Sequence, residues 1–278
     1  MFRDALAAVD GTPSSFQAAA YAAILSRAKG GSVTLLSVVD PVRDASKLRD
    51  PTPQKQADLR SATATIGDLG LVRAAEIAEG RPAQVILDRC HGGDADLICL
   101  GAGRKPRTLG STSSEVVRHA RCPVLVVREG PSVGLQIERI LVAFDGSESA
   151  LRAVDVAGRL AGDVSGACFL LWILEGPWPL PRRGVDLSRE EVQALAGPPE
   201  QEEMTRAKER IEEAGGEVSR ATFEIGDAAD RILARAEDWN VDLIVLGARS
   251  RNPTGRLLRR GVSDRVVARA DRPVLVVH

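Results

Sequence analysis

A segment rich in glycine and basic residues is the clearest candidate for chemistry in this sequence. Residues 101–115 read Gly-Ala-Gly-Arg-Lys-Pro-Arg-Thr-Leu-Gly-Ser-Thr-Ser-Ser-Glu, with three cations and no acid among the first ten. Glycines let a backbone approach an anion closely, and the N–H groups at a helix start form a phosphate site. Thr112 and Glu115 have the spacing of a capping box, which predicts a helix start beside Gly110-Ser111. The segment indicates anion binding or, more simply, a solvated basic surface.

A second basic segment lies between Gly247 and Gly261 near the end of the chain. It also contains no acid, and its five arginines are Arg249, Arg251, Arg256, Arg259 and Arg260. Its glycines alone are weak evidence for a ligand. The recurrence of such a segment after a similar apolar run strengthens the interpretation as a binding loop.

An aspartate follows an apolar run in each half of the chain, at Asp10 and at Asp145. At the end of a strand, such a carboxylate can accept hydrogen bonds from the hydroxyl or amine donors of a ligand. It can also be a turn residue, because Thr12-Pro13 and Ser147-Glu148 are typical helix starts. The two roles are compatible, and the sequence leaves both open.

The elements that would position these residues alternate between strands and helices. Residues 33–39 and 97–100 are apolar on both faces, as strands of a covered parallel sheet must be. Residues 15–29 and 83–90 carry Ala and Leu at helical spacing. This alternation predicts an α/β fold with a doubly wound parallel sheet. Ligands of such sheets bind beyond the carboxyl ends of the strands, where the strand order reverses.

The same unit is written twice in the chain. Four segments of the first half recur in order in the second: 6–11 as 141–146, 35–40 as 170–175, 96–101 as 242–247, and 122–127 as 272–277. We therefore expect two tandem domains, 1–130 and 137–278, each with five parallel strands, and a linker at 128–138. The last strand of each copy is apolar and would lie at a sheet edge, so we expect these two strands to pack or pair with each other. The chain would then be a pseudo-dimer.

Composition excludes several classes of function. The 278 residues include 37 basic and 38 acidic ones, which argues against a general attraction to nucleic acid or acidic membranes. The longest strongly apolar run, 167–174, is too short to cross a bilayer. The start, Met1-Phe2-Arg3-Asp4, is unlike a secretory signal, so we expect a cytoplasmic protein.

No catalytic or metal-binding constellation is visible. The four cysteines form no CxxC pair and the three histidines are scattered, which predicts buried reduced thiols and no metal site. GxSxG and HEXXH motifs are absent, as are the His-x-Gly-His signature of adenylate-forming enzymes and the Ser-Gly-Gly-x-Asp-Ser loop of pyrophosphatase-type enzymes. We expect no catalytic residue and no enzyme.

Over nearly its whole length, the chain resembles the universal stress protein family, specifically members with two tandem domains. The resemblance rests on Val-Asp-Gly at 9–11, Asp40, Asp-Leu-Ile-x-Leu-Gly at 96–101, Gly-Ser at 110–111 and the closing Pro-Val-Leu-Val-Val. It implies a five-stranded α/β sheet of the adenine nucleotide alpha hydrolase-like type and frequent dimerisation through the last strand. It also implies ATP binding in the subset that carries Gly-x2-Gly-x9-Gly-(Ser/Thr) after the fourth strand.

Neither repeat carries that ATP-binding pattern intact. In the first, Arg104 replaces the second glycine and the loop before Gly110 is four residues short. In the second, Ser250 and Arg260 replace glycines, and Gly261 stands at the Ser/Thr position. By position, the first candidate nucleotide pocket comprises Asp10, Val38, Leu100, Gly101, Arg104, Gly110, Ser111 and Thr112, and the second comprises Asp145, Ile173, Gly247 and Gly261. We favour the first, because its Gly-Ser step and helix start survive.

Two functions from different classes follow from these observations. The first is a stress-response protein that binds an adenine nucleotide, ATP with or without Mg²⁺, as a regulatory switch toward an unidentified protein partner, either as a single chain or as a homodimer. The alternative is a nucleotide-independent scaffold with two degenerate pockets. Slow ATP hydrolysis is a third hypothesis, for which the sequence offers no water-positioning residue.

Overall fold

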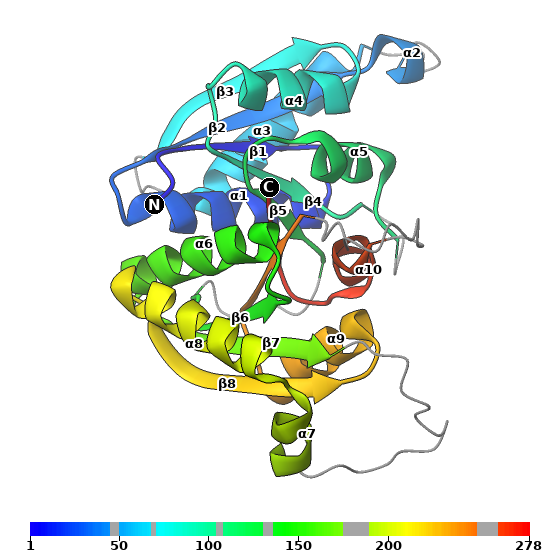
Figure 1. Cartoon of the computed structure of the whole chain (residues 1–278). Coiled ribbons are helices and arrows are strands. Elements are labelled where there is room, and N and C mark those ends of the chain that lie inside the picture. Colours follow the sequence, from blue (N-terminus) through cyan, green and yellow to red (C-terminus); the bar gives the residue numbers. More distant parts are fainter. Residues whose placement is uncertain (45–49, 68–70, 104–107, 130–135, 175–188, 249–260) are drawn as a thin grey trace. The chain divides into compact units, whose positions relative to one another are not determined.

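A computed structural model of the chain describes residues 1–44, 50–67, 71–103, 108–129, 136–174, 189–248 and 261–278. The chain divides into two compact units, one formed by Met1–Gln136 with Val267–His278 and the other by Ile137–Val266 (Figure 1). The C-terminal segment therefore belongs to the first unit, although its sequence belongs to the second repeat. The boundaries 1–130 and 137–278 remain our proposal for the two repeats.

Five parallel strands form the sheet of the first unit. Their order is β3-β2-β1-β4-β5, with β1 (Asp4–Ala8), β2 (Ser32–Val39), β3 (Val72–Glu79), β4 (Leu97–Gly101) and β5 (Val124–Val127). The strand order reverses between β1 and β4. A sixth strand, β10 (Val274–Val277), is antiparallel to β5 and places Leu275 opposite Leu125. The predicted pairing of the two last strands is thus confirmed.

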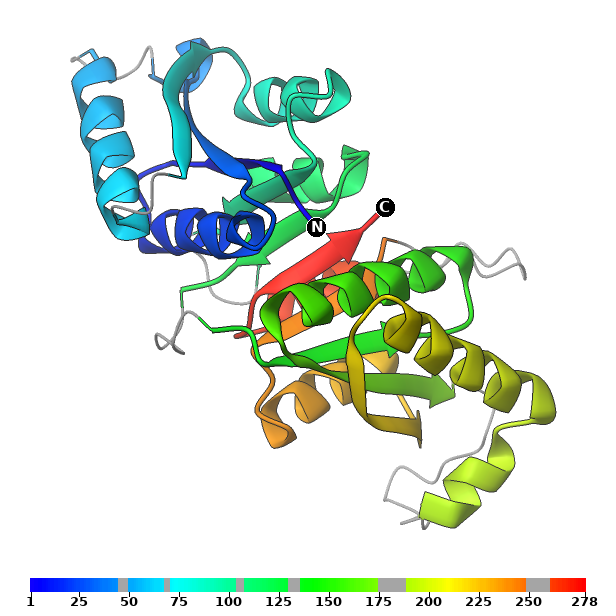
Figure 2. The same ribbon diagram turned by 90° about the vertical axis from the view of Figure 1, so that its left-hand side faces the viewer.

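Helices cover both faces of this sheet (Figure 2). Helices α1 (Pro13–Arg27) and α3 (Thr52–Ile66) pack together on one face, and α4 (Pro82–His91) and α5 (Ser111–His119) pack together on the other. A single turn, α2 (Pro41–Asp44), follows β2, and α10 (Val262–Arg269) precedes β10. The predicted helices at 15–29 and 83–90 correspond to α1 and α4. Each begins at a proline, which the first helical turn accommodates because its N–H groups have no intrahelical partner.

The second unit repeats the pattern with four parallel strands in the order β9-β6-β7-β8. These strands are β6 (Arg139–Phe144), β7 (Ala167–Leu174), β8 (Glu217–Ile225) and β9 (Leu243–Gly247). Helix α6 (Glu148–Val164) packs against α8 (Pro198–Glu213), and the remaining helices are α7 (Arg189–Leu195) and α9 (Ala228–Asp238). With β10 counted by sequence, each repeat has five strands, and the predicted doubly wound α/β class is confirmed.

The central strands form the core, as their two-sided apolar sequences predict. Leu97 to Leu100 in β4 and Leu243 to Leu246 in β9 are all buried. Helix α1 packs against β4, and its alanines Ala18, Ala19 and Ala22 have no exposed surface. These small side chains allow the helix to lie close to the sheet, which matters for the candidate site below.

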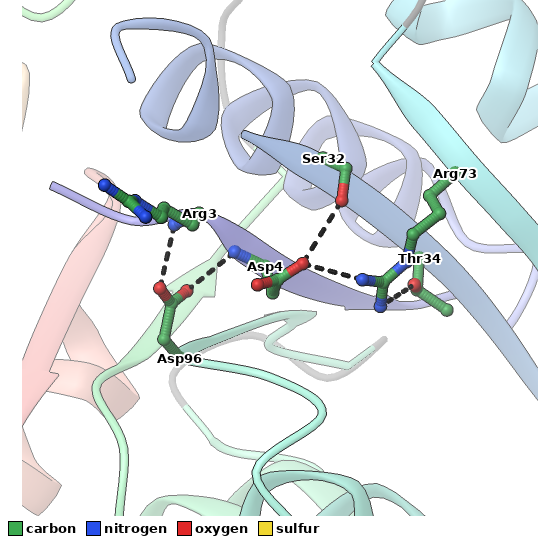
Figure 3. A network of polar contacts seen from close by, with 6 residues as sticks. All are labelled: Arg3, Asp4, Ser32, Thr34, Arg73 and Asp96. Carbon is green, nitrogen blue, oxygen red and sulfur yellow. Dashed lines mark hydrogen bonds and ion pairs between the residues drawn. The ribbon is translucent and has the colours of Figure 1, made fainter. Parts of the chain in front are cut away.

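An aspartate ahead of the fourth strand joins the strand starts in each repeat. The Asp96 carboxylate accepts hydrogen bonds from the backbone N–H groups of Arg3 at 2.8 Å and Asp4 at 3.1 Å (Figure 3). The Asp4 carboxylate in turn accepts hydrogen bonds from Ser32 Oγ at 3.3 Å and Arg73 Nη1 at 2.7 Å. This network lies at the amino ends of the strands. The aspartate of the repeated Asp-Leu-Ile motif therefore has a structural role.

In the second repeat, the aspartate ahead of the equivalent strand makes the same kind of hydrogen bonds. Asp242 Oδ2 accepts hydrogen bonds from the backbone N–H groups of Glu138 and Arg139, both at 2.9 Å.

All four cysteines of the chain are buried free thiols, as expected. In the described part of the chain, no helix is long and apolar enough to span a membrane.

Candidate functional site

The first candidate pocket begins where β1 ends and α1 starts. Asp10 is exposed, and its Oδ1 accepts hydrogen bonds from the backbone N–H of Thr12 at 3.0 Å and from the Thr12 hydroxyl at 2.5 Å. Thr12 caps α1 by accepting a hydrogen bond from Ser15 N at 3.3 Å. The turn role foreseen for Asp10 is therefore present in the structure. Both hydrogen bonds of this turn go to the same carboxylate oxygen, Oδ1.

The end of β4 lies directly against the first turn of α1. A Cβ added to Gly101 would stand 2.5 Å from Ser14 Oγ and 3.0 Å from Ser15 N, so this close approach requires glycine. Asp10 N donates to Ser15 Oγ at 3.4 Å. Asp10, Ser15 and Gly101 thus form one contiguous group at the point where the strand order reverses.

The two apolar residues of the predicted pocket lie in the strands beside this group. Leu100 pairs with Ala8 across β1 and β4 and is buried. Val38 lies near the end of β2 and is 8% exposed. The neighbouring Ser37 Oγ donates to Val9 O at 2.8 Å, which ties the end of β2 to the residue before Asp10.

Helix α5 starts on the β4 side of the same group. Ser113 Oγ donates to Gly101 O at 2.7 Å, and Gly110 N donates to Ala102 O at 2.9 Å, which draws the two ends of the 101–111 loop together. Gly110 is the N-cap of α5 and, as a glycine, makes no side-chain cap hydrogen bond. By contrast, Thr12 and Ser147 cap α1 and α6 with their hydroxyl oxygens.

The predicted capping box at Thr112 and Glu115 is wrong. Helix α5 begins at Ser111, so Thr112 lies inside its first turn, and the Glu115 carboxylate forms an ion pair with Arg81 at 3.4 Å. The predicted helix start beside Gly110-Ser111 is nevertheless confirmed. The N-cap glycine supplies no side-chain oxygen of its own to the first N–H groups of α5, and the positive end of a helix dipole favours an anion. Arg104 lies outside the described residues.

Asp58, which the sequence analysis did not single out, borders this pocket from α3. A Cβ added to Gly11 would stand 2.7 Å from Asp58 Oδ2, so the carboxylate lies directly over the turn after Asp10. Asp58 is buried, and its Oδ1 accepts a hydrogen bond from Gln54 Nε2 at 2.9 Å. One sequence pattern could have pointed to Asp58: it is an acid on the same helical face as Leu59, Ala62 and Ile66, which are all buried.

Arg128, expected to open the linker at 128–138, is the second residue whose part in this site the sequence did not indicate. It follows β5 at the same sheet edge as Gly101, which pairs with Val127. Its guanidinium donates to Thr108 O at 3.2 Å in the loop before Gly110, and to Ala268 O at 2.9 Å. Burial lowers the pKa of this guanidinium. Arg128 therefore follows the last strand of the first repeat and also contacts the loop before Gly110.

The second candidate pocket differs at the start of its first helix. Asp145 Oδ1 accepts a hydrogen bond from Ser147 N at 3.0 Å, which repeats the turn at Asp10. However, a Cβ added to Gly146 would stand 3.0 Å from the Trp172 ring, which also packs edge-on against Phe144 with ring centroids 5.0 Å apart. Trp172 occupies the repeat position of Ser37 and fills space beside this turn with an apolar ring.

The remaining residues of the second pocket are only partly brought together. A Cβ added to Gly247 would stand 2.6 Å from the backbone carbon of Ser149, so β9 approaches α6 as β4 approaches α1. Ile173 is 8% exposed near the end of β7. Gly261 lies at the start of α10, and residues 249–260, which join it to β9, lie outside the described residues. Within the described ranges, no three His, Cys, Asp or Glu side chains gather as a metal site.

Comparisons with known proteins agree on one family. The model of the universal stress protein family matches residues 1–128 and again residues 136–278. A universal stress protein of Mycobacterium tuberculosis is 28% identical over 234 residues, which span 81% of this chain and 72% of the relative. One from Thermus aquaticus is 34% identical over 142 residues, 46% of this chain and all of the relative. The crystal structure of a universal stress protein from Archaeoglobus fulgidus superposes with a TM-score of 0.69 at 21% identity, over 98% of this chain and 95% of that one. The chain belongs to the universal stress protein family.

Proposed function

We propose that this protein binds an adenine nucleotide, ATP, in the first repeat, as a regulatory ligand and not as a substrate. The observation that carries the proposal is the start of α5. There a helix of nine residues begins at Ser111, after an N-cap glycine that supplies no side-chain cap, at the reversal point of a parallel sheet, beside the closely packed Gly101. Phosphate oxygens would accept hydrogen bonds from the first backbone N–H groups of this helix.

The polarity of the pocket supports a ligand with an anionic and a neutral end. The start of α5 favours negative charge. Across the pocket, Asp10 and Asp58 supply carboxylate oxygens, which suit the hydroxyl and amine donors of a nucleoside and disfavour phosphate. Val38, which is 8% exposed near the end of β2, supplies apolar surface for a base. A nucleoside phosphate bound with its phosphates toward α5 satisfies both halves.

The first repeat is favoured over the second for two reasons. Trp172 fills the space beside Gly146, whereas the equivalent turn at Gly11 faces a carboxylate. Moreover, Gly261 stands where the first repeat has Ser111, the residue that follows the glycine cap. The proposal includes a cytoplasmic location and a protein partner that senses the nucleotide-bound state. A scaffold with two degenerate pockets is the competing function.

Binding is tested by isothermal titration and by thermal unfolding with ATP, with and without Mg²⁺. A ligand at 100 times its dissociation constant should stabilise the folded state by about 2.7 kcal/mol. We expect one ATP per chain and a clear rise in Tm at millimolar ATP. The absence of heat and of a Tm shift at that concentration would favour the scaffold.

Two matched variants, Gly110→Asp and Gly261→Asp, locate the site. Among the described residues, the atoms nearest to an added Cβ lie 3.6 Å away at Gly110 and 3.8 Å away at Gly261, so neither substitution meets a clash there. Aspartate is also a good N-cap, so Gly110→Asp should preserve or raise stability while its carboxylate repels phosphate. We expect Gly110→Asp to abolish ATP binding and Gly261→Asp to leave it unchanged. The reverse result would place the site in the second repeat.

A further inference from the structure

Arg128 makes an unusual set of contacts for a residue at the end of a strand. Its Nη2 donates to Ala268 O at 2.9 Å and, at longer range, to Val267 O at 3.4 Å, while its Nε donates to Ala270 O at 3.2 Å. All three carbonyls belong to the last turn of α10 or to the residue after it. These carbonyls have no intrahelical partner, and a cation is favoured at this end of a helix dipole. Arg128 therefore caps the C-terminal end of α10.

The same guanidinium also holds the loop that precedes α5. Its Nη2 donates to Thr108 O at 3.2 Å, two residues before the N-cap Gly110. The Arg128 guanidinium thus connects the α5 end of the first candidate site to α10, a helix whose sequence belongs to the second repeat. The fixed fork of an arginine is suited to several carbonyls at once, whereas a lysine offers a single ammonium point. In the second repeat, His278 stands at the equivalent position.

We propose that Arg128 is a positioning residue that couples nucleotide occupancy of the first site to the order of the C-terminal segment 267–278. The inference rests on the proposed nucleotide binding and adds a regulatory path to it. A phosphate on the first turn of α5 steadies Gly110 and, through Thr108, the guanidinium that holds the end of α10. Coupling of this kind is reciprocal, so loosening the contact at 267–270 also weakens the phosphate site.

The coupling makes a prediction that distinguishes phosphate from nucleoside. Because Arg128 acts at the α5 end of the pocket, Arg128→Lys should lower the affinity for ATP by about tenfold and leave the affinity for adenosine almost unchanged. General damage to the pocket would weaken both. If Arg128 bound the phosphate directly, lysine would largely restore ATP affinity, because it keeps the positive charge. If Arg128 instead holds several carbonyls with its guanidinium, lysine would not restore the affinity.

The experiment combines calorimetry with hydrogen–deuterium exchange on the full chain. In the wild type, ATP should slow amide exchange in 267–278, and adenosine should not. In Arg128→Lys this protection should be lost. Arg139→Lys is the matched control, because Arg139 Nη1 also donates to a carbonyl at a helix end, Trp239 O, at 3.0 Å, but in the second unit. This control should bind ATP like the wild type.

The outcomes separate the coupling from the proposed function. If the wild type binds neither ATP nor adenosine, nucleotide binding fails and the coupling fails with it. If the wild type binds ATP but exchange in 267–278 does not change, the coupling alone is overturned. Equal ATP affinity in Arg128→Lys and the wild type would also overturn it. The exchange measurement on the wild type needs no variant, so a folding defect in Arg128→Lys does not block the test.

Discussion

The Trp172 ring lies against Gly146, at 3.0 Å from where a Cβ at that position would be placed. Gly146 has a φ of +76°, in the left-handed region that glycine adopts without strain. The turn after Asp145 is therefore limited in two ways, by its backbone conformation and by the indole above it. In the first repeat, the turn after Asp10 has a similar φ at Gly11 but faces the Asp58 carboxylate. The two repeats thus share a backbone and differ in what fills the space above it.

We predict that Gly146→Ala destabilises the protein more than Gly215→Ala. Gly215 has a φ of +89° with no atom within 4 Å of an added Cβ, so its substitution carries backbone strain alone, about 1 kcal/mol. Gly146→Ala carries the same strain and must also displace the indole, which adds about 1 kcal/mol. Urea unfolding measures the difference between the two variants. Equal losses would show that the ring yields without cost.

The sequence predicted the architecture because its signals are local. Residues 97–100 are apolar at every position, and only a strand covered on both faces explains that pattern without exposing leucine. The repeat then placed Asp10 and Gly101 at neighbouring strand ends, and the contacts through Ser15 confirm this arrangement.

The site details depend on tertiary contacts that no local pattern carries. Four consecutive residues, 111–114, are Ser or Thr, so each is a plausible helix cap by its own chemistry. The hydrogen bond from Ser113 Oγ to Gly101 O uses one of these hydroxyls to join α5 to β4, and the cap falls to Gly110. Likewise, the role of Arg128 depends on carbonyls some 140 residues away in the chain. Such a partner has no signal in a single sequence.

A charge reversal between the repeats leads to a second prediction. Arg81 at the start of α4 pairs with Glu115 at 3.4 Å, whereas in the second repeat Asp227 at the start of α9 pairs with Arg265 through two bonds of 2.6 and 2.8 Å. We expect a coupling energy of about 1 kcal/mol for Asp227 with Arg265 and close to zero for the longer pair. In the Arg81 pair one nitrogen, Nη2, reaches both Glu115 oxygens at 3.4 Å, whereas Arg265 uses two nitrogens on two oxygens at shorter distances. Long exposed pairs contribute little, and the bidentate geometry is what adds energy.

A double-mutant cycle measures this coupling with Asp227→Asn and Arg265→Gln. Asn remains a good N-cap, so the hydrogen bond that Asp227 accepts from Asp230 N at 3.0 Å should survive and only the charge is removed. The matched cycle uses Arg81→Gln and Glu115→Gln. Equal coupling energies in the two cycles would contradict the prediction.

The third prediction concerns alkaline pH and the buried thiol of Cys168. Burial raises the pKa of this thiol from 9.0 to about 12, because the thiolate would lose its hydration in the core. Below pH 9 the thiol is protonated in both the folded and the unfolded state and has no effect on the pH dependence. Between pH 9 and pH 12 the unfolded state releases the proton while the folded state keeps it, so the free energy of unfolding falls by about 1.4 kcal/mol per pH unit.

Comparison of the wild type with Cys168→Ala isolates this contribution from the other groups that titrate at high pH. The variant loses some packing at every pH, since the Cys168 side chain is fully buried in β7. Its loss of stability between pH 8 and pH 10 should nevertheless be smaller than that of the wild type by about 1.4 kcal/mol. Urea unfolding at the two pH values supplies the numbers. Parallel pH profiles for the two proteins would mean that the thiol does not stay protonated in the folded core.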